Sequence, residues 1–483
     1  MTIDMVMHNA WKAFLTFRKT SPKQRADLMK RIAFKLEHSG DELIQIAMRE
    51  TNLPEVRLKN ERNRTIFQLT QYAEACQQGL WLDARIDHAL PERVPPRPDI
   101  RKMNIGLGPV VVFGASNFPF AYSTAGGDTA TALAAGCSVV VKAHPAHPET
   151  SDFVARLIEQ AMTEEGYDYP IFQHVHGISN EVGKALVMHE HTKAVGFTGS
   201  FSGGKQLYDW AQQRKEPIPV FAEMGSINPI FILAEKLRSD GLWLAEQLAG
   251  SITLGVGQFC TNPGLIITTQ SAGLDAFLSA LSERIAAIAP AKMLHQGISK
   301  AYNSNRSQAL AQSDVRVVSV SAVEAIEDEG QPTMATVGGD AFLANPILHQ
   351  EVFGPYSLVV VCKDEKQMMQ IASSIEGQLT CSIMATDNEL SHELFKLIDL
   401  KCGRMILNGV PTGVEVCWSM QHGGPFPATT DSRFGSVGPD AIKRFVRPIS
   451  FQNYPDGLLP DELKESNPLN VIRMMNGLLE QST

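Results

Sequence analysis

The sequence predicts an α/β protein with two parallel sheets, each covered by helices on both faces. Between residues 104 and 225, short apolar runs alternate with helical stretches, such as PVVVF at 109–113 before the helix TAGGDTATALAAG. The same alternation restarts at residue 226 and continues to residue 420. Strands and helices that alternate at this spacing form doubly wound sheets.

Outside these two regions, the sequence predicts helices at the beginning and extended chain at two later places. In the first eighty residues, Ser21-Pro22 supplies a cap and a first-turn proline, and helical spacing follows as far as Gly40. Four prolines in residues 91–99, PERVPPRPD, predict a linker or an edge strand. Residues 445–454 predict a β-rich run, after which we expect a polar helical end.

The composition is that of an ordinary globular protein and excludes several function classes. The 483 residues carry a net charge of −9, so no basic surface argues for nucleic-acid binding. The sequence has no run of about 20 apolar residues, which predicts no membrane span. The first residues, MTIDMVMHNAWKAFLTF, lack the basic start and cleavage site of a signal peptide, so we expect a cytoplasmic protein.

The seven cysteines indicate free thiols rather than cross-links. No pair has C-x-x-C spacing and the number is odd, which argues against a disulfide framework and against zinc. This use of cysteine is typical of a reducing compartment. Two histidine pairs, His174/His176 and His189/His191, have no further ligand nearby in the sequence, so we expect no metal site.

Cys260 differs from the other cysteines because it lies in a glycine-rich loop, GVGQFCTNPG. A substrate can approach a thiol closely in such a loop, and the cysteine's own backbone N–H can donate to an oxyanion. The local sequence fits a buried structural thiol equally well.

Two polar residues follow apolar strands at positions suited to acid–base chemistry. Glu223, in PVFAEMGS, is placed to act as a general base, although a solvated strand-end glutamate is commoner. Asn117, in GASNFP, can donate its amide to an oxyanion, but it suits a helix cap or an Asx turn as well.

The first α/β region has weak signals for a nucleotide. No G-x-G-x-x-G is present, and only the turn with Gly199 and Ser200 offers a strand-to-helix phosphate site. Lys142 ends the strand SVVVK, at the sheet edge where nucleotides bind, and Glu351 in QEVFGP can accept from ribose hydroxyls. The alternatives are an ordinary βα turn at Gly199-Ser200, a surface position for Lys142 and an exposed loop position for Glu351.

Taken together, seven segments in this order resemble the aldehyde dehydrogenase superfamily along nearly the whole chain. Commoner family members have Trp at the position of Ser116 and a second Gly at the position of Ser226. Both departures, with KAHPAHP and EMGSINP, resemble the branch of α-ketoglutaric semialdehyde dehydrogenases and NADP-preferring bacterial fatty-aldehyde dehydrogenases. The seven segments are GASNFP, VVVKAHP, VGFTGS, FAEMGSINP, GQFCTNPG, EVFGP and HGGPFPATTDSRFGSVG.

This resemblance implies the chemistry and the catalytic residues. Cys260 is expected to be the nucleophile that forms a thioester with the aldehyde. Asn117 and the Cys260 backbone N–H would form the oxyanion hole. Glu223 would activate the hydrolytic water, and its presence disfavours the acylating, CoA-dependent members, which usually lack this base. A non-catalytic protein on the same fold is the remote alternative, and it would have lost Cys260 or Glu223.

The resemblance also implies how a nicotinamide cofactor is bound. Lys142 and Glu351 would hold the two riboses, Gly199 and Ser200 would lie by the pyrophosphate, and Phe353 by the nicotinamide. NAD-preferring members have an acid a few residues after the matched lysine, whereas this chain has AHPAHP there. Because no carboxylate would repel a 2′-phosphate, we expect NADP to be used, with NAD tolerated.

The implied architecture is a Rossmann-type cofactor domain, an α/β catalytic domain and a β oligomerisation extension. The cofactor domain would comprise residues 1–84 and 104–225, and the catalytic domain residues 226–430. Residues 85–103 and 445–460 would form the extension of a homodimer or homotetramer.

Two substrate classes remain open. The first is 2,5-dioxopentanoate, oxidised to 2-oxoglutarate, whose carboxylate requires a cation; Arg97, Arg101 and Arg433 are the candidate sources. The second is a medium- or long-chain aliphatic aldehyde. An apolar tunnel for it would use the residues Ala121, Ala125 and Phe426.

Overall fold

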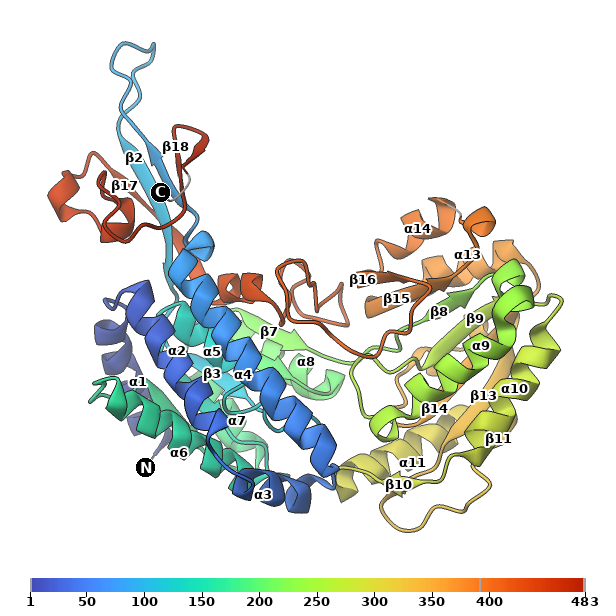
Figure 1. The fold of residues 1–483 in the computed structure, drawn as a ribbon. Helices are drawn as coiled ribbons and strands as arrows, with labels where there is room; N and C mark the ends of the chain where they lie inside the picture. The colour runs from blue at the N-terminus through green and yellow to red at the C-terminus, as the bar shows by residue number, and fades with distance from the viewer. Residues whose placement is uncertain (1, 391, 481–483) are drawn as a thin grey trace.

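The computed structural model describes residues 2–390 and 392–480, which form two α/β lobes and a projecting β-sheet (Figure 1). The chain begins with helices, as predicted, and its described part has four α-helices before β1 (Ala84–Asp87). The second starts at Ser21, whose hydroxyl and the Gln24 side chain form a reciprocal capping box before Pro22. The four helices are α1 (Ile3–Phe17), α2 (Pro22–Glu37), α3 (Glu42–Thr51) and α4 (Glu55–Gln78).

The first lobe is built on a five-stranded parallel sheet with the order β5-β4-β3-β6-β7. The chain leaves the central strand β3 in one direction and returns to its other side, so a topological switch point lies between β3 and β6. In such sheets, ligands bind beyond the carboxyl ends of the strands at the switch point. The strands are β3 (Val110–Phe113), β4 (Val139–Lys142), β5 (Phe172–Val175), β6 (Ala194–Thr198) and β7 (Val220–Glu223).

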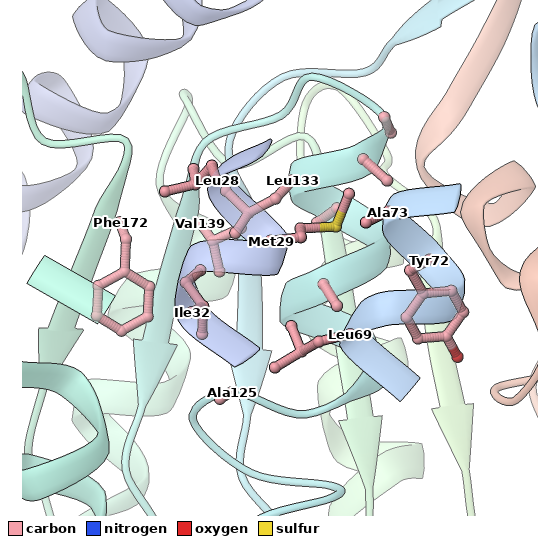
Figure 2. Close-up of a cluster of buried hydrophobic side chains, with 14 of the residues drawn as sticks. Leu28, Met29, Ile32, Leu69, Tyr72, Ala73, Ala125, Leu133, Val139 and Phe172 are labelled. Carbon is pink, nitrogen blue, oxygen red and sulfur yellow. The ribbon is translucent and has the colours of Figure 1, made fainter. Parts of the chain in front are cut away.

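Alternate side chains of β3 pack against two different helical layers. Val110 and Val112 face α2, α4, α5 (Gly127–Ala134) and α6 (Pro148–Glu164) in one core cluster. Figure 2 shows other members of this cluster, among them Leu28 and Leu69. Val111 faces the other way, toward α1, α7 (Asn180–Met188) and α8 (Phe201–Gln212). This two-sided burial explains why the strand is a continuous apolar run rather than an alternating pattern.

The second lobe is built on a seven-stranded sheet with the order β11-β13-β14-β9-β8-β15-β16, in which only β11 is antiparallel to its neighbour. Helices α9 and α10 cover one face, and α11 to α14 cover the other. The strands are β8 (Ile230–Ile232), β9 (Leu265–Thr269), β11 (Arg316–Val320), β13 (Thr333–Gly338), β14 (Tyr356–Cys362), β15 (Gln378–Met384) and β16 (Cys402–Leu407). The helices are α9 (Ala234–Thr253), α10 (Leu274–Ala287), α11 (Gln296–Leu310), α12 (Gly339–Ala344), α13 (Glu365–Ser374) and α14 (His392–Ile398). A separate two-stranded ribbon pairs β10 (Ala291–Lys292) with β12 (Glu329–Gly330).

A third sheet projects from the first lobe and has the order β17-β2-β1-β18-β19 (Figure 1). The predicted polar helical end of the chain is wrong, because the tail forms a short hairpin whose first strand pairs with β1. Local polarity gave no sign of this long-range pairing. The strands are β1 (Ala84–Asp87), β2 (Ile100–Gly106), β17 (Val446–Gln452), β18 (Arg473–Met475) and β19 (Leu478–Glu480).

A long segment, residues 408–438, leaves β16 and returns from the second lobe to the first without forming a helix or strand (Figure 1). Its Thr429 forms an isolated antiparallel bridge with Glu223 at the end of β7, and the Met224 N–H donates to the Ala428 carbonyl. The return segment is therefore held against the edge of the first sheet. None of the helices in the described part of the chain has the length and hydrophobicity needed to cross a membrane.

Candidate active site

A cavity of about 490 Å³ lies between the two lobes, beyond the carboxyl ends of β3, β6 and β7. Its volume suits a small-molecule site. Lys142 is the only one of the eight predicted site residues that does not line it, although His144, two residues later, does. The seven that line it are Asn117, Gly199, Ser200, Glu223, Cys260, Glu351 and Phe353.

The backbone before Cys260 has an unusual conformation that glycine permits. Gly257 has a φ of 65°, and a Cβ built there would lie 2.2 Å from the Gly354 carbonyl carbon. Val256 also has a positive φ, of 58°, which is uncommon for a β-branched residue. Asn228 then fixes the loop, since its Nδ2 donates to the Cys260 carbonyl oxygen at 2.9 Å.

Glu223 ends β7 with its side chain buried, only 2% exposed. Its Oε2 accepts a hydrogen bond from the Ser436 hydroxyl, and its Oε1 lies 3.0 Å from Nε2 of His422. Both partners come from the return segment, 408–438. The position at the end of an apolar strand therefore holds a buried and partnered carboxylate, rather than a solvated one.

His422 completes the cluster, and the sequence reasoning missed it. Its Nε2 lies 3.5 Å from the Cys260 sulfur as well as 3.0 Å from Glu223. His422 stands in HGGPFPATTDSRFGSVG, a segment that carried the family resemblance, but nothing in its local sequence indicates a role. One imidazole nitrogen placed between a thiol and a carboxylate can move a proton from one to the other.

The pKa values of Cys260 and Glu223 are shifted in opposite directions. Burial, and then the nearby Glu223 carboxylate, raise the pKa of the Cys260 thiol well above its ordinary value. Burial alone would also raise the pKa of Glu223, but His422, Ser436 and Cys260 together lower it. The resting site therefore holds a thiol and a carboxylate at neutral pH.

Asn117 follows β3 and points toward the cysteine loop. Its Nδ2 donates to the Gln258 carbonyl oxygen at 3.2 Å, two residues before Cys260. An amide nitrogen has two N–H groups, so this bond leaves a second donor for an oxygen bound at Cys260.

The opposite part of the cavity has the features of a dinucleotide site. Ser200 is the N-cap of α8, and its hydroxyl accepts from the Gly203 N–H at 3.2 Å. Gly203 also lines the cavity, so the beginning of α8 faces it. A Cβ on Gly225 would lie 2.7 Å from Oε2 of Glu351, and burial raises the pKa of Glu351 to about 8. A helix N-terminus and a carboxyl group at this switch point fit a phosphate and a ribose hydroxyl.

The arginines predicted to bind a substrate carboxylate lie elsewhere, so that prediction is wrong. Arg97 donates to the His88 carbonyl in the projecting sheet, and Arg101 is buried in the same sheet beside Asp99. Arg433 is exposed and paired with Asp431. None of the three lines the cavity that holds Cys260.

The residues predicted for an apolar tunnel also lie outside the described cavity lining. Ala121 and Ala125 are buried in the first lobe. The Phe426 ring is 56% exposed and contacts the Phe201 ring.

The histidine pairs have neighbours that the sequence did not predict. Asp152 lies 3.3 Å from His174 and 2.7 Å from His176. Asp4 lies 3.4 Å from His189. The expectation that no further ligand lies near either pair is therefore wrong in three dimensions.

Comparison with known proteins shows the family of the chain. The model of the Aldehyde dehydrogenase family matches residues 1–447 of this chain. The chain is 45% identical over 484 residues to an alpha-ketoglutaric semialdehyde dehydrogenase of Acinetobacter baylyi, covering 99% of this chain and 92% of that protein. It is also 45% identical over 481 residues to alpha-ketoglutaric semialdehyde dehydrogenase 2 of Azospirillum brasilense, with the same coverage.

Solved structures share the fold. Betaine aldehyde dehydrogenase from Staphylococcus aureus, in complex with NAD⁺, has a TM-score of 0.80 at 18% identity, covering 94% of this chain and 88% of that one. A 3,6-anhydro-L-galactose dehydrogenase in complex with NAP has a TM-score of 0.78 at 23% identity, covering 92% of this chain and 90% of that one. This chain therefore belongs to the aldehyde dehydrogenase family, and it is an enzyme that oxidises an aldehyde with a nicotinamide cofactor.

Proposed function

We propose that this enzyme oxidises 2,5-dioxopentanoate, the semialdehyde of 2-oxoglutarate, to 2-oxoglutarate. The observation that carries the proposal is the 45% identity, over 99% of the chain, to two proteins named for this substrate.

In the proposed oxidation, Cys260 attacks the aldehyde carbon as a thiolate. Because the resting group is a thiol, its proton must first leave, and Nε2 of His422 at 3.5 Å is placed to accept it and pass it toward Glu223. The Asn117 amide and the Cys260 backbone N–H donate to the alkoxide that forms. When bound, a nicotinamide supplies the hydride acceptor of the reaction.

The oxidised adduct is a thioester on Cys260, and its hydrolysis needs a base. Glu223 has this role in the proposal, after the proton taken from the thiol has left to solvent. Its lowered pKa keeps it ionised at neutral pH, and Ser436 and His422 fix its orientation. Water attacks the thioester carbon as Glu223 takes a proton, and the carboxylate product leaves as the thiolate is released.

We also propose that Lys142 and Glu351 bind the cofactor riboses, that Gly199 and Ser200 bind the pyrophosphate, and that Phe353 contacts the nicotinamide. NADP is the preferred form in this proposal, and NAD is also used. Support comes from the stretch after Lys142, which has no acid before residue 149. The side chain there, Glu149, is exposed and paired with Arg49.

For the chain's organisation, we propose that residues 1–84 and 104–225 bind the cofactor and that residues 226–430 carry the catalytic thiol. The projecting sheet, with residues 85–103 and 445–460, would join subunits of a homodimer or homotetramer. Its exposed apolar side chains support this role, among them Val94 (94% exposed) and Leu478 (75%). The free cysteines favour the cytoplasm as its compartment.

The experiment that tests the proposed substrate compares kcat/KM for 2,5-dioxopentanoate with kcat/KM for a series of unbranched aliphatic aldehydes. Formation of NADPH and of NADH is followed separately by absorbance. We expect the dioxo acid and NADP to give the highest value. A value that rises steadily with alkyl chain length, and exceeds that of the dioxo acid, would mean a fatty-aldehyde enzyme instead.

A further inference from the structure

Arg64, on α4, is a partly buried cation without an ion-pair partner among the described residues. Its one hydrogen bond runs from Nη2 to the Tyr122 hydroxyl at 3.3 Å, and its Nε is buried without an acceptor in the described chain. A guanidinium has five N–H donors, so most of its binding capacity is unused. A cation that has lost water without gaining a carboxylate is costly to keep.

The neighbouring arginine on the same face of α4 is different. Arg57 lies two helical turns before Arg64, and its Nη1 is 2.6 Å from Oε2 of Glu61. The other oxygen of Glu61 accepts from the backbone N–H groups of Phe120 and Ala121. Glu61 is therefore fully engaged, and it acts on Arg64 only through its charge.

A second cation of this kind comes from the other lobe. Arg404, on β16, donates to the carbonyl oxygens of Pro411 at 2.7 Å and Gly413 at 3.0 Å. Its Nε is also buried without an acceptor, and it has no ion pair within the described residues. Two separate elements thus supply a guanidinium with an unused N–H.

Both guanidinium groups act on the same place. Arg64 reaches the site through its hydrogen bond to the Tyr122 hydroxyl. Arg404 reaches it beside the return segment, since a Cβ on its neighbour Gly403 would lie 2.0 Å from the carbonyl oxygen of Gly423, the residue after His422. Tyr122 connects Arg64 to the site directly, because its ring centroid lies 6.3 Å from that of His422. Both arginines therefore lie beside the catalytic cluster of Cys260, Glu223 and His422, behind the side chains that line the cavity.

We infer that Arg64 and Arg404 bind the distal carboxylate of the substrate, four bonds from the aldehyde carbon held at Cys260. This inference rests on the proposed function, which requires a carboxylate-bearing aldehyde. Arginine suits the task because its planar N–H groups match the two oxygens of a carboxylate. The carboxylate supplies the missing acceptor, and its absence in a neutral aldehyde leaves the two cations unpaired.

The competing role for Arg64 is electrostatic, since its positive charge lowers the pKa of the Cys260 thiol against the larger effect of burial. That role would favour thiolate formation with every aldehyde. A carboxylate-binding role discriminates between substrates, so matched charged and neutral aldehydes separate the two.

The test uses the variants Arg64→Met and Arg404→Met of the full-length enzyme. Each is assayed with two pairs of equal chain length: 2,5-dioxopentanoate with pentanal, and succinic semialdehyde with butanal. We expect kcat/KM for the acids to fall about 100-fold, mainly through KM, and that for the neutral aldehydes to stay within about threefold. Arg433→Met, which removes an exposed arginine paired with Asp431, is the matched control and should change neither.

Retained turnover of the neutral aldehydes also shows that the variants fold. Arg64→Lys, which keeps the charge but loses the planar donors, should recover part of the acid activity. Equal losses for acids and neutral aldehydes, or an unchanged acid preference in both variants, would overturn the inference. A wild-type enzyme that prefers pentanal to 2,5-dioxopentanoate would instead overturn the proposed function, while succinic semialdehyde and butanal still test the arginines.

Discussion

Nε2 of His422 lies 3.0 Å from Oε1 of Glu223, and both side chains are almost completely buried. The same nitrogen lies 3.5 Å from the Cys260 sulfur. A buried imidazole between a carboxylate and a thiol gives the nucleophile's proton a defined path, and this contact leads to the first prediction.

Replacing His422 with glutamine keeps a hydrogen-bonding side chain but removes the group that accepts the thiol proton. We expect kcat/KM to fall about 100-fold or more at neutral pH, and to recover partly in alkaline solution, where hydroxide can take the proton. A kcat/KM profile against pH checks this. His176→Gln, at a histidine 48% exposed and paired with Asp152, is the control. Wild-type activity in the His422 variant would exclude the proton path.

The raised pKa of Cys260 predicts slow alkylation of this residue at neutral pH. Burial and the Glu223 charge hold the proton on sulfur, so the reaction with iodoacetamide should accelerate only above the ordinary cysteine range of about 8.5. Peptide mass spectrometry follows Cys260 and, as an internal reference, the partly exposed Cys417. A midpoint for Cys260 at or below about 8.5 would contradict the expected resting thiol.

The same raised pKa makes a stability prediction. The folded protein holds the Cys260 proton more tightly than the unfolded chain, so its contribution is present below the unfolded pKa and is lost as pH rises toward the folded one. We expect Cys260→Ala to lose less stability on alkaline titration than the wild type. The variant should also lack aldehyde oxidation and still bind NADP. Full oxidation by the variant would rule out Cys260 as the nucleophile.

The carboxyl group of Glu351, whose pKa is raised to about 8 by burial, should make cofactor binding depend on pH. A carboxylate accepts from ribose hydroxyls more strongly than a protonated acid does, so affinity for NADP should increase as pH rises through about 8. The affinity at each pH is measured by titrating the enzyme with NADP and following the fluorescence of the protein. Glu351→Gln should remove the dependence, and an unchanged profile in that variant would assign it to another group.

Gly257 should be essential for the conformation of the cysteine loop. Alanine there would need a left-handed backbone and would bring its Cβ within 2.2 Å of the Gly354 carbonyl carbon. We expect Gly257→Ala to lower the free energy of unfolding by about 3 kcal/mol and to reduce activity strongly. Gly457→Ala is the matched control, since no atom lies within 4 Å of a Cβ built there. Equal melting temperatures of the two variants would contradict this account.

Local patterns were enough to predict the two α/β lobes. The apolar run PVVVF predicted a strand, and in the structure both faces of that strand are buried. Ser21-Pro22 predicted the start of a helix, and the capping box at Ser21 confirms it. The last strands were missed, because β18 has only three residues and pairs with β1, nearly 390 residues earlier.

The site shows the same difference between what local sequence patterns predict and what only long-range contacts reveal. Cys260, Glu223 and Asn117 stand in segments that are ambiguous singly but resemble one family when taken in order, and the fold brings the three residues to one cavity. His422 reaches Cys260 from 162 residues away, through a segment that has no regular structure. Arg64 lies on a helix whose sequence shows only ordinary charged residues. The importance of His422 depends on the partners that the fold gives it, and that of Arg64 on the partners that it lacks. No local sequence pattern shows either.

The measurement that tests the account most directly is the intact mass of Glu223→Gln after brief mixing with NADP and 2,5-dioxopentanoate. In this variant His422 can still accept the thiol proton, but hydrolysis of the thioester lacks its base, so reduced cofactor should form in a burst stoichiometric with enzyme and then stop. We predict an added oxoglutaryl group on Cys260, absent when the same experiment is done with Cys260→Ala. Steady turnover by the Glu223 variant without a burst or an adduct would contradict the proposed thioester and the role of Glu223.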